Sequence, residues 1–442
     1  MRLTDFPDEI LLIIVSLIPF NSNLAKVTLV SHRFRALTEK FLYRNVHLHA
    51  EPLEECRVGF IPPLKRTDQL IANLKARPEL GKYTAAFSLR VTHHLWYRSY
   101  PQLSILRRMP HLRQLSFDPP AVHGGGPPSE CKSLTALRLN FRHVTNHYYE
   151  DGGPSWLTLG IPLEIIARYL WHPSLRKLQA EKLFFTALFE HELWLGSPRM
   201  RRGRSPVEDL RFLSCWPEVN GNAVTEFLLS ISHLKCFVLE IGQRRKLLEV
   251  LPNVPSPPQF DIRPALSIHQ ATIEELAIST SEHALEPGNL VQSPGSFVLW
   301  TALKRLAVPI VMISEGVSHS AILCQVLPPQ LEELQLEKKS WHFSEHGFDY
   351  PEEAQAEGEK DLTLMKELAK NKKACVPVLK RLIWWVQYPS AIKLNDSRYS
   401  VYTYVIEAEV LESTLKNVGV EFELISTETF KDTPFGRRLY EW

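Results

Sequence analysis

A short pattern of apolar residues, Φ-x-x-Φ-x-Φ with Φ for an apolar side chain, recurs along most of this 442-residue chain and constrains its fold more than any other feature. The clear copies are Leu112-Leu115-Phe117, Leu134-Leu137-Leu139, Leu234-Phe237-Leu239, Ile273-Leu276-Ile278, Leu303-Leu306-Val308, Leu331-Leu334-Leu336 and Leu379-Leu382-Trp384. The weaker copies are Thr84-Phe87-Leu89, Leu175-Leu178-Ala180 and Val207-Leu210-Phe212. Neighbouring copies, clear and weaker together, start between 22 residues apart (Leu112 to Leu134) and 48 residues apart (Leu331 to Leu379), so the pattern predicts an irregular array with insertions.

The Φ-x-Φ end of each copy predicts a short strand whose alternate side chains face inward. One such unit cannot cover its own apolar face, so neighbouring units should stack into a parallel sheet. Helical spacing between the strands predicts outer helices over residues 67–77, 163–171, 223–232 and 361–370. The predicted fold class is α/β, an irregular solenoid in the form of an arc with a parallel β-sheet and outer helices. A doubly wound α/β domain is the alternative, and the recurring sequence pattern Leu-(Lys/Glu/Arg)-x-Leu-x-Leu favours the repeats.

The first helix of the chain has two apolar stripes where an ordinary surface helix has one. Pro7 suits a first helical turn, and the residues up to about Ile18 form one stripe of Ile10, Ile14 and Leu17 and a second of Leu11, Val15 and Ile18. In a domain of about 45 residues only one stripe can be covered from within. We therefore expect a second polypeptide to cover the other stripe.

Two further apolar segments follow the first helix. The spacing of Leu24, Val27, Val30, Phe34 and Leu37 predicts a second helix. A third segment, Phe41-Leu42-Tyr43, leads into Val46 and Leu48, which alternate like a strand.

This N-terminal stretch resembles the F-box, on the residues Phe6-Pro7-Asp8-Glu9-Ile10, Leu24 and Val30-Ser31-His32-Arg33-Phe34. Phe6, Ser31 and Phe34 stand where the family most often has Leu, Cys and Trp. The later chain is similar to leucine-rich repeats, and its closing strand Val420–Leu424 and its tail Thr433–Leu439 resemble fungal F-box proteins. The resemblance implies an N-terminal three-helix F-box domain over 1–48, a helical linker over 49–83, an irregular leucine-rich-repeat-like solenoid over 84–426 and a tail over 427–442.

In the family the F-box docks on a Skp-type adaptor, which links it to a cullin. The resemblance therefore implies a non-catalytic substrate-recognition subunit of a ubiquitin ligase, with a protein target on the repeats. The adaptor-binding residues that it implies are Phe6, Pro7, Ile10, Ile14, Leu17, Leu24 and Val27. Two alternatives stay open: an F-box scaffold that works outside the ligase, and a repeat-fold binding protein unconnected with ubiquitin.

Aromatic residues follow several of the predicted strands, and strand ends in a stacked array meet at one edge of the sheet. Aromatic side chains often carry binding energy at interfaces. The residues that we expect to bind a target at this edge are Trp96, Tyr97, Tyr100, Tyr148, Tyr149, Trp216 and Trp385. Packing of these aromatics beneath their own loops is the alternative.

The charge balance is close, with 51 basic and 49 acidic residues, and gives no reason to expect nucleic acid or a membrane as a partner. Six scattered cysteines are typical of reduced thiols in a cytoplasmic or nuclear protein. The apolar run at 10–18 is too short to span a bilayer. We find no phosphate-binding, dinucleotide-binding, zinc-protease or nucleophile-elbow motif, and His93, His94, His143 and His147 have no third metal ligand at a recognisable spacing. We expect no cofactor and no metal.

Overall fold

The computed structural model describes residues 3–18, 21–50, 65–91, 104–117, 131–140, 161–162, 166–167, 169–181, 183–184, 203–215, 221–241, 262–280, 296–314, 325–339, 343–344, 347–348, 351–387, 409–426 and 430–440. The chain forms two compact units, Met1–Ala180 and Glu181–Trp442. Each unit combines parallel strands with helices, so the fold is α/β as the sequence predicted.

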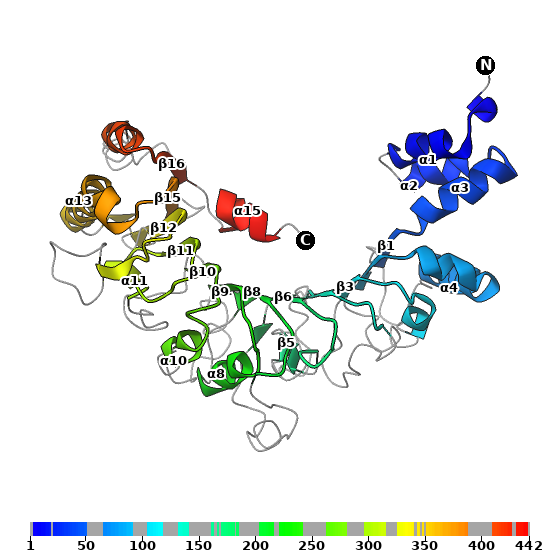
Figure 1. Ribbon diagram of the computed structural model, residues 1–442, viewed down its shortest axis with the longest axis horizontal. Helices are drawn as coiled ribbons and strands as arrows, with labels where there is room; N and C mark the ends of the chain where they lie inside the picture. The colour runs from blue at the N-terminus through cyan, green and yellow to red at the C-terminus, as the bar shows by residue number, and fades with distance from the viewer. Residues whose placement is uncertain are drawn as a thin grey trace. The chain divides into compact units, whose positions relative to one another are not determined.

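The first unit starts with helices and continues with parallel strands (Figure 1). Its helical elements are η1 (Leu3–Asp5), α1 (Asp8–Ser16), α2 (Asn21–Val27), α3 (His32–Leu42), α4 (Lys65–Ala76), η2 (Pro78–Tyr83) and η4 (Ser104–Arg108). Its strands are β1 (Asn45–Ala50), β2 (Ala86–Val91), β3 (Gln114–Phe117), β4 (Ala136–Leu139), β5 (Ile161–Pro162) and β6 (Lys177–Glu181). Strands β1, β2, β3, β4 and β6 pair in that order, and every pair is parallel.

The second unit continues the alternation of strands and outer helices. Its strands are β7 (Leu183–Phe184), β8 (Asp209–Cys215), β9 (Cys236–Ile241), β10 (Glu275–Thr280), β11 (Arg305–Pro309), β12 (Glu333–Lys339), β13 (Phe343–Ser344), β14 (Gly347–Phe348), β15 (Arg381–Gln387) and β16 (Glu421–Ser426). Its helical elements are α8 (Gly221–Leu229), α10 (Arg263–Ser267), α11 (Val311–Ser314), α13 (Pro351–Cys375), η6 (Phe430–Asp432) and α15 (Pro434–Tyr440). Strands β8 to β12, β15 and β16 pair in chain order and in parallel.

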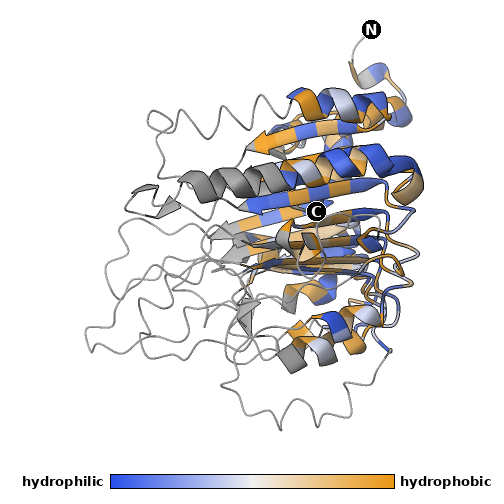
Figure 2. Cartoon of the chain, turned by 90° about the vertical axis from the view of Figure 1, so that its left-hand side faces the viewer, coloured by the Kyte–Doolittle hydropathy of each residue, from blue (hydrophilic) through white to orange (hydrophobic). Residues whose placement is uncertain are grey.

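The recurring apolar pattern lies in register across these strands. The second Φ of successive copies is directly paired from β8 to β15, and these side chains are fully buried: Leu210, Phe237, Leu276, Leu306, Leu334 and Leu382. Hydrophobic and hydrophilic residues alternate along the strands in Figure 2. All ten copies fall on strands, which confirms the sequence prediction. Strand order within each unit follows the chain, so neither unit has the strand reversal of a doubly wound sheet.

A ladder of opposite charges precedes the strands of the second unit. The ammonium groups of Lys235, Lys304 and Lys380 donate hydrogen bonds of 2.7, 2.8 and 2.7 Å to the glutamates of the preceding repeats, Glu208, Glu274 and Glu332. These hydrogen bonds hold the pKa of Glu274 and of Glu332 below the ordinary value. Such exposed ion pairs stabilise a fold only weakly, so the buried leucines dominate its stability.

Several boundaries differ from the sequence predictions. The second predicted helix is two helices, because Ser31 accepts a 3.2 Å hydrogen bond from the backbone N–H of Phe34 and caps a new helix there. Strand β1 pairs with β2, so the repeat array already includes residues assigned by sequence to the F-box domain. The helix predicted over 361–370 begins ten residues earlier, at Pro351. Cys375, buried at the end of α13, is disulfide-bonded, so the expectation of a reduced thiol is wrong at this residue.

Shortening one buried leucine of the array should destabilise the second unit strongly. We expect Leu334→Ala to lower the free energy of unfolding by about 2–5 kcal/mol, because the truncation leaves a cavity between fixed neighbours. Lys380→Ala, which removes an exposed charge next to the adjoining strand, should leave the unfolding midpoint nearly unchanged. Urea unfolding of both variants compares the two contributions, and equal destabilisation would contradict the dominance of the apolar register.

Acid should weaken the second unit through a buried histidine. His269 is 2% exposed and its Nε2 lies 3.0 Å from the carbonyl oxygen of Leu228. Burial lowers the pKa of His269 below its ordinary value of 6.5, since the neutral ring is favoured in the folded state. As pH falls below 6.5 the unfolded chain takes up a proton that the folded chain does not, so stability is lost. Urea unfolding at pH 7.5 and 5.5 should show a larger loss in the wild type than in His269→Gln, and equal losses would contradict this role.

Candidate functional site

The three N-terminal helices share a small core. Leu11 of α1 and Phe34 and Leu37 of α3 are buried together. Phe6, Leu12 and Val27 pack against this cluster. Figure 1 shows α1, α2 and α3 grouped together in the first unit. The inner stripe of α1 is thus covered by the domain itself, as the sequence analysis expected.

Polar contacts fix the start of α1 against α3. The guanidinium group of Arg33 donates a 2.8 Å hydrogen bond to the Asp8 carboxylate and a 2.7 Å hydrogen bond to the backbone carbonyl of Phe6. Asp8 also lies in the first turn of α1, where the helix dipole favours a negative charge. One side chain therefore sets the position of both the Phe6–Pro7 entry and the helix that follows.

A second set of ion pairs ties α3 to the rest of the first unit. Arg77, between α4 and η2, donates two hydrogen bonds of 2.6 and 2.8 Å to the carboxylate of Glu39, which also accepts one of 3.1 Å from Arg35. The hydrogen bond from Arg77 lowers the pKa of Glu39 below its ordinary value. The bidentate geometry holds α3 in a fixed orientation against the segment after α4.

The other stripe of α1 remains exposed. Ile10, Ile13, Ile14 and Leu17 have exposed fractions of 40, 57, 37 and 75%. These positions follow the i, i+3, i+4, i+7 spacing of one helical face. Leu29 and Val30, just after α2, are also exposed, by 85 and 67%. An exposed apolar row of this kind is typical of a surface that binds another protein. We refer to Ile10, Ile13, Ile14 and Leu17 as the α1 row.

The residues predicted to bind an adaptor fall into two groups. Pro7, Ile10, Ile14 and Leu17 are exposed, whereas Phe6 and Val27 pack against the helical core and Leu24 is buried. The second group supports the shape of the domain and does not offer its side chains fully to a partner. Ile13, Leu29 and Val30 were not predicted, although the helical spacing already placed Ile13 beside Ile10 and Leu17.

The residues predicted to bind a target are mostly outside the described part of the chain. Six of the seven lie outside the described residues: Trp96, Tyr97, Tyr100, Tyr148, Tyr149 and Trp216. Trp385 is described, and it corrects the expectation of an exposed aromatic edge. It lies in the middle of β15 and is fully buried, because the C-terminal segment packs over it.

Within the described ranges, no group of three or more His, Cys, Asp or Glu side chains could hold a metal ion. In the same residues no helix is both long and apolar enough to cross a membrane. Burial raises the pKa of the Cys236 thiol well above its ordinary value, which makes this cysteine a poor nucleophile. The α1 row itself consists of four exposed aliphatic side chains, which suit binding by apolar contact.

The comparisons with known proteins add no assignment. No protein-family model matches the chain, and a search among curated proteins gave no match.

The two stripes of α1 should respond differently to a charge. Leu11→Asp should unfold the N-terminal helices, since it places a carboxylate in their core. Leu17→Asp should change the free energy of unfolding by only about 0.5 kcal/mol, because that side chain is 75% exposed. Circular dichroism and thermal unfolding of both variants test this difference. A Leu17→Asp chain as unstable as the Leu11→Asp chain would contradict the exposed row.

Proposed function

We propose that this chain is the substrate-recognition subunit of a Skp–cullin–F-box ubiquitin ligase. The α1 row carries this proposal, since it lies inside the segment that resembles the F-box and leaves four aliphatic side chains uncovered on one helical face. A Skp-type adaptor would cover the row and link the chain to a cullin.

The rest of the chain is compatible with a receptor. Parallel strands in chain order, each carrying the same apolar register, are the arrangement of leucine-rich repeats, and such arrays present extended surfaces to other proteins. The chain itself would form and break no covalent bond. It would raise the effective concentration of a bound target near the ubiquitin-charged enzyme.

Substitutions in the α1 row should weaken adaptor binding. We expect Ile14→Asp with Leu17→Asp to reduce the affinity by about 30-fold or more, as the loss of an interface anchor of roughly 2 kcal/mol does. The control is Leu299→Asp, which changes a leucine in the second unit whose exposure (69%) is close to that of Leu17 (75%). Co-purification with a Skp-type adaptor, followed by isothermal titration calorimetry, measures the effect.

Three outcomes separate the candidate functions. Co-purification of both adaptor and cullin with the wild type and the control, but not with the double variant, supports the ligase. Adaptor without cullin supports a scaffold that works outside the ligase. A folded wild-type chain that does not bind the adaptor overturns the proposal and leaves a repeat protein of another function.

A further inference from the structure

One face of the sheet in the second unit carries buried apolar residues beside charged ones, where a repeat sheet is expected to be polar. The buried copies of the pattern point to the outer helices, so the alternate residues of each strand point the other way. On β8, β9, β10, β11 and β15 these alternate residues include Leu213, Val238, Ala277, Ala307 and Trp385, all at most 1% exposed. We call these five residues the apolar strip.

In the first unit the corresponding outward-facing strand positions are polar. Ser88, Ser116 and Arg138 are paired in register on β2, β3 and β4, and all three are partly exposed. The repeat pattern therefore does not itself demand an apolar residue at these positions. The apolar strip of the second unit has a separate cause.

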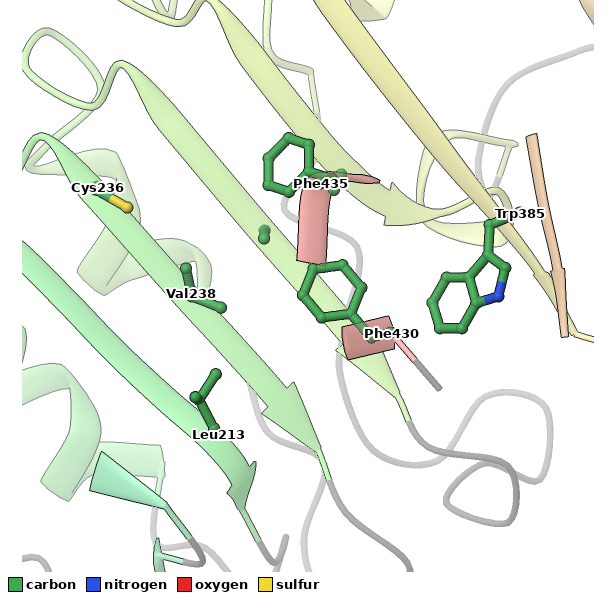
Figure 3. Close-up of a cluster of buried hydrophobic side chains, with 8 residues drawn as sticks. Leu213, Cys236, Val238, Trp385, Phe430 and Phe435 are labelled. Atoms are coloured by element: carbon green, nitrogen blue, oxygen red, sulfur yellow. The ribbon is translucent and has the colours of Figure 1, made fainter. Parts of the chain in front are cut away.

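The C-terminal segment covers the apolar strip. Phe430 of η6 and Phe435 of α15 are 2% and 0% exposed and belong to the same buried cluster as the strip. The ring of Phe430 lies 5.8 Å from that of Trp385 and 6.3 Å from that of Phe435, between centroids. In Figure 3 the rings of Phe430 and Phe435 lie between Val238 on one side and Trp385 on the other. In Figure 1, α15 lies on the side of the strands away from α8, α10 and α13.

A charge contact orients the segment on the sheet. Arg438 donates hydrogen bonds of 3.1 and 3.3 Å to the two carboxylate oxygens of Glu333 and one of 3.4 Å to Glu275. Both glutamates are mostly buried, and Arg305 lies between them, 3.5 Å from Glu275. The Arg438 guanidinium also lies 4.8 Å from the centre of the Phe435 ring. The sheet thus offers two carboxylates to one arginine beside an aromatic site.

The segment has its own compact conformation. Thr433 is buried, donates a 2.8 Å hydrogen bond to the carbonyl of Phe430 and accepts one of 2.9 Å from the N–H of Gly436. A Cβ atom at Gly436 would lie 1.8 Å from the carbonyl oxygen of Phe430, so only glycine fits there. These contacts place two phenyl groups and one arginine on the same side of a short peptide, at positions i, i+5 and i+8.

We propose that the apolar strip with Glu275 and Glu333 is a peptide-binding site for a target segment with two aromatic side chains followed by an arginine, and that residues 430–440 are its built-in, displaceable occupant. The aromatic groups fit the strip, and the arginine balances the carboxylates that flank Arg305. Gln335 lies in the same row between Ala307 and Ile383, is 1% exposed, and its Oε1 accepts no hydrogen bond from any described residue, so it offers one acceptor to an incoming peptide.

The proposal deepens the proposed function by naming where the receptor would hold its target, and rests on it to that extent. A short segment held through three side chains can open without unfolding the sheet below it. While attached, it competes at an effective concentration on the order of millimolar, so a free target must match its chemistry or bind more tightly. The test below contains no adaptor, so its failure is distinguishable from failure of adaptor binding.

A labelled peptide with the sequence of residues 427–442 tests the site. The full-length chain with Phe435→Ala and Arg438→Glu should bind this peptide, since its own segment no longer fits. The wild type and the control variant Arg437→Glu, which changes the exposed neighbouring arginine, should bind at least about 100-fold more weakly. Fluorescence anisotropy measures the affinities, and circular dichroism establishes that each chain is folded.

The specificity of the contact is tested with a second peptide and a second chain. A peptide with glutamate at the position of Arg438 should not bind to the double variant. The original peptide should not bind to a chain that carries Glu333→Arg in addition to Phe435→Ala and Arg438→Glu. Equal binding of both peptides, or no binding by the folded double variant, would overturn the proposal.

A measurement on the unmodified protein avoids the risk that the double variant does not fold. In hydrogen–deuterium exchange, the amides of residues 430–440 should exchange at least about tenfold faster than those of β9 to β12, through local opening. If the amides of residues 430–440 exchanged at the same rate as those of the sheet, the segment would be a permanent part of the core. That result would contradict the proposal of a displaceable occupant.

Discussion

Each repeat of this chain carries an apolar strand face that its own residues cannot cover, and only the next repeat can bury it. From β8 to β15 the central leucine or phenylalanine of each strand pairs directly with that of its neighbour, and all of them are fully buried. A slip of one residue would turn every one of these side chains to the other face. The strand order, the parallel pairing and the place of the outer helices all follow from this register.

Of two further apolar surfaces, one is covered by the chain itself and the other is exposed. The apolar strip of the second unit is covered by the chain itself, through Phe430 and Phe435. The α1 row is left open, although the same helix buries Leu11 and Val15 completely. Exposed aliphatic side chains gain free energy when another surface removes them from water. The open row therefore supports the proposal of a partner protein. The covered strip supports the proposal of a ligand that resembles residues 430–440.

These two surfaces suit the proposed role of a receptor that joins two proteins. The polar contacts found in the described residues hold elements in place: Arg33 and Arg77 fix α1 and α3, and Arg438 fixes the C-terminal segment. A receptor of this kind works through orientation and proximity, so rigid positioning of its binding surfaces is the property on which its action would depend.

The strands, their inward-facing side chains and the two stripes of α1 could be predicted from the sequence, because they follow from periods of two and 3.6 residues within one segment. The sequence also indicated that one stripe of α1 lacks a cover. It could not decide which aromatic residues are exposed. Trp385 looked like a surface aromatic, and Phe430 and Phe435 lay in what looked like a tail, yet the three are buried together. Their burial comes from long-range packing, because Trp385 is covered by a segment some 45 residues further along the chain, and no local pattern records such a contact.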